Sequence, residues 1–149
     1  MHFRIATKND VPEMVRMLAD DVLGSKRESY QDPLPNEYYE AFKEIEEQKG
    51  NCILVAVEED ELLGFLQLTI IPSLSQMGMK RAHIEGVRVD KKFRGQRIGE
   101  KLFEYAFKCA KEAKCGMVQL TTDKTRKDAH RFYERLGFVS SHDGMKRRL

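Results

Sequence analysis

Several features that would point to a membrane, a disulfide framework or a nucleic acid are missing from this chain of 149 residues. No run of eighteen apolar residues occurs, and the first residues show no signal-peptide profile. The three cysteines are odd in number and lack CxxC spacing, so neither disulfides nor a zinc site is indicated. We therefore expect a cytoplasmic protein with no membrane partner.

The chain also lacks a large excess of either positive or negative charge. The net charge is +2 and the pI is 8.4, whereas a nucleic-acid-binding domain is expected to exceed a pI of about 9 with a clustered basic face. We expect no nucleic-acid partner. A composition of 41% hydrophobic and 34% charged residues fits one globular domain, residues 1–149.

Hydrophobic periodicity predicts an alternation of strands and helices. Four amphipathic helices are expected, with apolar faces at 11–22, 38–45, 98–113 and 129–136. The first is expected to begin with a capping box formed by Asp10 and Glu13, and Gly116 is expected to end the third. A polar, flexible connection is expected at 72–79. Strands are expected at 2–6, 52–57, 62–71, 81–89, 117–121, 138–140 and 145–149. This order predicts an α/β (α+β) fold with a mixed sheet of about seven strands and about four helices, not a doubly wound parallel sheet.

The strand at 81–89 has an irregular alternation. Ile84 belongs to one parity, while Val87 and Val89 belong to the other. If all three face the core, one extra residue must be absorbed between them, and Gly86 is the natural place for a β-bulge.

The segment after this strand, 89–99, leads into the first turn of a helix and carries four cations, Lys91, Lys92, Arg94 and Arg97. Free N–H groups and the helix dipole favour an anion there, and Gly95 and Gly99 would allow close backbone approach. The segment matches neither a Walker A motif nor a GxGxxG fingerprint, which disfavours ATP, GTP and NAD. An ordinary basic helix cap is the alternative interpretation.

Two motifs resemble the GNAT superfamily of acetyl-CoA-dependent N-acetyltransferases, and so does the order of elements. Residues 94–99, RGQRIG, are similar to its pyrophosphate loop, and residues 129–138, AHRFYERLGF, are similar to its last helix. The resemblance implies a mostly antiparallel central sheet, acetyl-CoA as acetyl donor, and a homodimer as one option. The cofactor-binding residues that it implies are Val87, Arg88, Val89, Arg94, Gly95, Gln96, Arg97, Ile98, Gly99, Arg126, Ala129 and Phe132.

Two positions depart from the family pattern. Arg97 stands where the loop usually has glycine, and Arg126 stands where asparagine often precedes the last helix. Locally, residues 127–133 with Ser141 and His142 are most similar to bacterial aminoalkylphosphonate N-acetyltransferases. That likeness favours small aminated substrates.

Two residues are candidates for the chemistry. Glu85, beside the expected bulge, is a candidate general base, with a solvated strand-face carboxylate as the alternative. The resemblance implies that Tyr133 is the general acid that protonates the departing thiolate, with plain core packing as the alternative. Backbone N–H groups freed at Val87 by the bulge are candidates to hold the acetyl carbonyl.

Other polar residues carry weaker signals. His83, His130 and His142 have no i, i+4 ligand spacing, so we expect no metal. Candidate acceptor-site residues are Arg27, Glu28, Tyr30 and Tyr38, each of which is alternatively a solvated loop residue.

Three functions remain open at this stage. The leading hypothesis is acetylation of a primary amine on a small molecule, by direct attack on acetyl-CoA. The second is acetylation of protein lysines or N-termini, and the third is a CoA-binding regulatory module without turnover.

Overall fold

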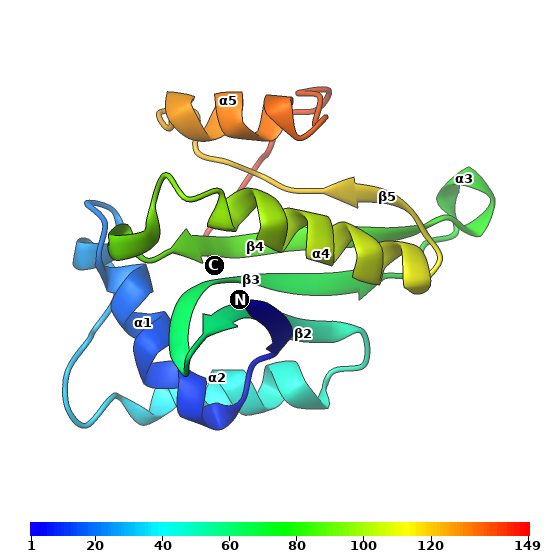
Figure 1. Ribbon diagram of the computed structural model, residues 1–149. Helices are drawn as coiled ribbons and strands as arrows, with labels where there is room; N and C mark the ends of the chain where they lie inside the picture. Colours follow the sequence, from blue (N-terminus) through cyan, green and yellow to red (C-terminus); the bar gives the residue numbers. More distant parts are fainter.

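The computed structural model describes residues 1–149 and is built on one five-stranded sheet (Figure 1). The strands follow one another across the sheet in chain order: β1 (His2–Ile5), β2 (Asn51–Glu58), β3 (Glu61–Ile71), β4 (Lys80–Val89) and β5 (Cys115–Gln119). Neighbours are antiparallel except β4 and β5, which are parallel. The sheet is therefore mixed and mostly antiparallel, as expected.

The helices divide between the two faces of the sheet. They are α1 (Val11–Ala19), α2 (Asn36–Glu47), α3 (Ser75–Gly78), α4 (Ile98–Glu112) and α5 (Lys127–Arg135). The buried residues of α1 and α2 join one core cluster, and those of α4 join the other, against which α5 packs (Figure 1). No helix has the length and apolar character that crossing a membrane requires.

The expected number of strands was too high, five being found instead of about seven, and there are five helices instead of about four. Residues 138–149 form no strand. Phe138 packs against the core cluster, but beyond it the apolar side chains find no cover: Val139 is 81% exposed and Met145 is 92% exposed. The additional helix, α3, is a single turn within the expected flexible connection at 72–79. Its residues Gln76 and Met77 have positive φ angles of 52° and 57°.

The boundaries of two helices also differ from expectation. α1 ends at Ala19, so Val22 is 78% exposed and does not extend the apolar face. Its capping box lies one turn earlier than expected, because the Asp10 carboxylate accepts the Thr7 N–H at 2.6 Å. At the C-terminal end of α4, Gly116 does not close the helix as expected but lies within β5. The residue that follows α4 in a left-handed conformation is Lys114, with a φ of 61°.

The bulge predicted in β4 is present. Gly86 and Val87 together lie opposite Leu66 of β3, and Gly86 has a φ of 64° that favours glycine. Immediately beyond the bulge, β3 and β4 approach closely. A Cβ on Gly64 would lie 2.6 Å from the carbonyl oxygen of Arg88, so only glycine fits there.

This bulge decides which face two charged side chains use. Glu85 pairs with Gln67 and Arg88 pairs with Phe65, and directly opposed residues leave the same face of a sheet. Phe65 belongs to the core cluster of α1 and α2. Glu85 and Arg88 therefore share the face covered by α1 and α2, whereas a regular strand would send residues three apart to opposite faces.

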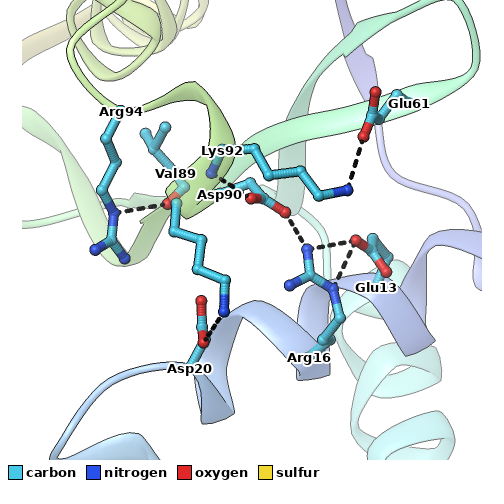
Figure 2. A network of polar contacts seen from close by, with 9 residues as sticks. Glu13, Arg16, Asp20, Glu61, Val89, Asp90, Lys92 and Arg94 are labelled. Atoms are coloured by element: carbon cyan, nitrogen blue, oxygen red, sulfur yellow. Dashed lines mark hydrogen bonds and ion pairs between the residues drawn. The ribbon is translucent and has the colours of Figure 1, made fainter.

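One buried ion pair joins α1 to the end of β4 (Figure 2). Asp90 is only 3% exposed and is the one charged residue in the core. Its carboxylate accepts hydrogen bonds from the Arg16 guanidinium and, at 2.8 Å, from the Lys92 N–H. Arg16 also donates to Glu13 at 2.6 Å. The start of segment 91–97 is thereby fixed against α1.

We predict that Asp90→Asn lowers stability by about 1.5 to 3 kcal/mol at neutral pH, because a charge-assisted hydrogen bond at a buried position is lost, although Arg16 keeps Glu13 as a partner. Burial alone raises the pKa of Asp90, but the Lys92 N–H and Arg16 outweigh it and hold the pKa below its ordinary value. The stabilisation is therefore complete above about pH 5 and is lost as the pH falls through the lowered value. Denaturant unfolding from pH 7 to pH 2 should show a flatter acid decline in the variant.

Asp20→Asn is the matched control for Asp90→Asn. The Asp20 carboxylate pairs at 3.0 Å with Lys91, whose side chain is 61% exposed, so its loss should cost less than about 1 kcal/mol. Equal stability of the two variants would contradict the importance given to the Asp90 pair.

Candidate functional site

The segment between β4 and α4 presents the unpaired N-terminus of a long helix. Arg97 is the N-cap of α4 with a left-handed φ of 60°, and no side chain caps this end. The first backbone N–H groups of a helix have no partner within it. Together with the helix dipole, these free donors make the start of α4 suitable for an anion.

Most of the cations in this segment are already neutralised. Three of the four pair with carboxylates: Lys91 with Asp20 (3.0 Å), Lys92 with Glu61 (3.3 Å) and Arg97 with Glu100 (2.6 Å). Arg94 has no carboxylate partner; its Nε donates to the Val89 carbonyl at 3.4 Å (Figure 2). Arg94 is therefore the cation of the segment that is free for an incoming anion.

The two glycines of the segment have different roles. Gly95 has a φ of 81°, and a Cβ there would meet no atom within 4 Å, so its surroundings are open. A Cβ on Gly99 would lie 3.3 Å from the Phe132 ring and 3.6 Å from Val89. Gly99 thus permits close packing of α4 against α5 and β4. The neighbouring Ile98 side chain is 6% exposed and lies in the core, which leaves only its backbone for a ligand.

Tyr133 of α5 packs against the core cluster under α4. Its ring centroid lies 5.7 Å from that of Phe103 and 6.0 Å from that of Phe138. Burial raises the pKa of its phenol above the ordinary value, and the positive charges of Arg126 and Arg88 only partly oppose this shift. The phenol is therefore protonated at neutral pH, and the side chain combines core packing with proximity to two guanidinium groups.

An apolar pocket of about 190 Å³ lies between α1, α2 and the sheet, and it reaches the bulge. Its lining residues are Val11, Met14, Val15, Leu18, Tyr38, Ala41, Phe42, Ile45, Ile53, Phe65, Gln67 and Gly86. A larger hollow of about 530 Å³ is lined by Lys8, Asn9, Pro12, Asn36 and Tyr39 and includes no strand residue. We take the smaller pocket as the candidate acceptor site because it touches the bulge, which the larger hollow does not.

Two of the four expected acceptor-site residues come together at this pocket. The Tyr38 hydroxyl donates to Glu28 at 2.8 Å and accepts the Ser29 N–H at 2.9 Å, which fixes the loop before α2. Tyr30 is 52% exposed and Arg27 is also exposed. Glu85 is exposed on the face that carries its partner Gln67, a lining residue of the pocket.

Sequence reasoning missed Asp21, which lies just after α1. Its carboxylate Oδ2 is 3.3 Å from Arg88 Nη2 and 3.8 Å from Arg126 Nη2. The two arginines were expected to contact the cofactor, and nothing in the sequence linked either to Asp21, because the three residues are far apart along the chain. Val87 lies on the other face, half-buried against the cluster that contains α4.

The side chains that commonly bind metal ions are not clustered in this structure. No group of three or more histidine, cysteine, aspartate or glutamate side chains is placed to hold a metal ion. Cys52, Cys109 and Cys115 are free and half-buried, and burial raises the pKa of each thiol.

Comparisons with known proteins place this fold among acetyltransferases. A Bacillus halodurans protein described as a transcriptional regulator is 52% identical, covers 99% of both chains and has a TM-score of 0.96. A candidate acetyltransferase from Agrobacterium tumefaciens is 26% identical over the whole of both chains, with a TM-score of 0.88.

Two curated proteins match over about a third of their own length. The aminoalkylphosphonate N-acetyltransferase of Salmonella typhimurium is 45% identical over 49 residues, 33% of this chain and 32% of that protein. Human N-alpha-acetyltransferase 30 is 28% identical over 138 residues, 93% of this chain and 34% of that protein. The model of the acetyltransferase (GNAT) family matches residues 17–138. The chain therefore belongs to the GNAT acetyltransferase family.

Proposed function

We propose that residues 1–149 form one catalytic domain that transfers an acetyl group from acetyl-CoA to a primary amine of a small molecule. The observation that carries this proposal is the pocket of about 190 Å³ at the β4 bulge. It is lined by Gly86 and lies on the face from which Glu85 projects. Its size suits a small acceptor, and the local likeness to an aminoalkylphosphonate N-acetyltransferase favours the same class.

The segment before α4 fits the diphosphate of acetyl-CoA. Gly95 is open, Arg94 has no carboxylate partner, and the helix end has no side-chain cap. Gln96, Arg97 and Gly99 complete the turn, and the β4 residues 87–89 lead into it. Acetyl-CoA supplies an acetyl group on a thioester, whose thiol is the leaving group.

The acceptor must lose a proton before or during attack. An amine with a pKa near 10.4 is neutral in only about one molecule in two thousand at pH 7, a cost of about 4.6 kcal/mol. We assign Glu85 as the base that takes this proton, directly or through a water molecule. A positioned base accelerates such steps by about 10² to 10⁴.

Tyr133 is assigned the opposite proton transfer. A new bond joins the amine nitrogen to the acetyl carbon, the carbon–sulfur bond breaks, and the Tyr133 hydroxyl gives its proton to the sulfur. The nitrogen releases its remaining extra proton to solvent as the amide forms, and the Tyr133 phenolate takes a proton back from solvent. Burial favours this role because it keeps the phenol protonated at neutral pH. Backbone N–H groups at Val87, on the bulge, are assigned to the acetyl oxygen as it gains charge.

A thiol-release assay with acetyl-CoA tests the proposal across small amines, polyamines, aminoalkylphosphonates and peptides. We expect release with small amines. Release with peptides alone would favour the protein acetyltransferase function, to which the 28% identity with N-alpha-acetyltransferase 30 points. Saturable CoA binding without release on any acceptor would favour a regulatory module, in keeping with the B. halodurans relative described as a transcriptional regulator.

Arg94→Gln should weaken CoA binding at least tenfold, because it removes a charge-assisted hydrogen bond worth about 1.5 to 3 kcal/mol. Isothermal titration with CoA measures the change. Lys92→Gln is the matched control, since Lys92 already pairs with Glu61, and its affinity should stay within about twofold. An Arg94 variant that binds as tightly as the control would move the diphosphate elsewhere.

Tyr133→Phe should reduce turnover at least tenfold while CoA affinity changes by no more than a few fold, because only the proton donor is removed. Steady-state kinetics and a CoA titration on the same preparation separate the two effects. Unchanged turnover would leave Tyr133 with a packing role alone.

Glu85→Gln should flatten the rise of kcat/KM with pH, since the amide cannot accept the proton of the acceptor ammonium. Glu44→Gln, on the solvent-exposed side of α2, is the matched control for loss of one carboxylate. A wild-type pH profile in the Glu85 variant would assign the base to another group.

A further inference from the structure

An under-neutralised group of guanidiniums surrounds Asp21, which follows α1. Its Oδ1 accepts the N–H of Gly24 and is thereby held by the loop. Its Oδ2 faces Arg88 of β4 at 3.3 Å and Arg126, the N-cap of α5, at 3.8 Å. Both distances exceed the usual 2.7 to 2.9 Å of a charge-assisted hydrogen bond, and this buried oxygen has no hydrogen-bond partner.

The positive charge of this group exceeds its negative charge. Arg27 is a third cation close enough to act on both Asp21 and Arg88. The Arg88 side chain is only 12% exposed, and its buried Nε also has no hydrogen-bond partner. Three guanidinium groups thus share one carboxylate. Arg27 and Arg126 are exposed, whereas Arg88 is mostly buried, and a buried charge without a full partner is costly. A second anion would relieve this imbalance.

Arg88 and Arg126 also lie close to the residues proposed for the reaction. The bulge sends Arg88 to the face that carries Glu85 and the acceptor pocket, and the charges of Arg88 and Arg126 act on the Tyr133 phenol. Arg88 therefore shares a face of the sheet with Glu85, and both guanidiniums lie close enough to Tyr133 for their charges to act on its phenol.

On this basis, and resting on the proposed function, we propose that the acceptor amine also carries an acidic group, a carboxylate or a phosphonate, which binds Arg88 and Arg126. A guanidinium presents a fork of donors that matches two oxygens of such a group. In the free protein, Asp21 attracts the two guanidinium groups but stays too far from them for a strong hydrogen bond to either. Arg27 adds long-range attraction for the acid.

The bulge also sets the spacing of the acceptor's two groups. The partners of Glu85 and Arg88 on β3 are two residues apart, so the two side chains leave the sheet about 6 to 7 Å from each other. An amine directed to Glu85 and an acid directed to Arg88 are then joined by a short aliphatic chain, which the apolar lining of the pocket accommodates. Short ω-amino acids and aminoalkylphosphonates have this form.

Kinetics with three matched acceptors test the proposal: 4-aminobutyrate, 3-aminopropylphosphonate and butylamine. The wild-type protein should prefer the two acids by at least about tenfold in kcat/KM. Arg126→Gln should raise KM for the acids by about tenfold while KM for butylamine changes by no more than about twofold. The order of the two acids distinguishes a carboxylate site from a phosphonate site.

Arg126 is chosen because its side chain is 44% exposed, so its replacement should not disturb folding as that of Arg88 would. Arg131→Gln is the control: this exposed guanidinium on α5 pairs only with Asp128 and should behave as wild type. Arg126→Lys retains the charge without the fork and should recover part of the preference. Thermal unfolding of each variant confirms that it is folded.

Several outcomes would overturn the proposal. Equal use of butylamine and the acids by the wild-type protein, or an equal loss on all three amines in Arg126→Gln, would exclude an acid subsite while acetyl transfer stands. A selective rise in KM for acetyl-CoA would assign Arg126 to the donor instead.

If no amine is acetylated, the proposed function fails, and the subsite is tested by thermal shift of the CoA-bound protein. Stabilisation by 4-aminobutyrate or 3-aminopropylphosphonate but not by butylamine, lost in Arg126→Gln, would uphold the acid subsite. Absence of any such shift would overturn it.

Discussion

The two-against-one pairing of Gly86 and Val87 with Leu66 is the constraint on which the arrangement of the site depends. It changes the alternation of β4 once, so that Ile84 and Val89 both contribute to the core cluster of α4 while Glu85 and Arg88 turn toward α1 and α2. A regular strand could satisfy only one of these requirements. The same irregularity needs Gly64 on the neighbouring strand, because a side chain there would collide with the Arg88 carbonyl.

Charge is distributed so that few cations are left without partners. In the segment before α4, neighbouring carboxylates take up three of four cations, and Arg94 alone has none. Around Asp21 the balance is reversed, with several guanidiniums and one acid. Because ion pairs at the surface contribute little to stability, the unequal neutralisation matters mainly for where anions can bind.

Local pattern predicted the parts of this protein that local chemistry determines. The parity break at Ile84 and Val87 located the bulge, and the helical spacing of Phe132 and Tyr133 located α5. The prediction of a C-terminal hairpin was wrong, because a turn sequence and alternating residues do not form strands without a surface to cover them. Asp21 was missed for a different reason: its partners come from β4 and α5, and only the folded chain brings them together.

The Asp90 carboxylate has a consequence for how this chain can vary. It ties α1, which forms a wall of the acceptor pocket, to the turn that leads into α4. The proposed donor and acceptor sites are therefore joined by one buried ion pair, which restricts their movement relative to each other. If the proposed sites are correct, side chains that line the pocket can be exchanged to suit another acceptor, whereas the distance between the proposed donor and acceptor sites depends on Asp90 and Arg16.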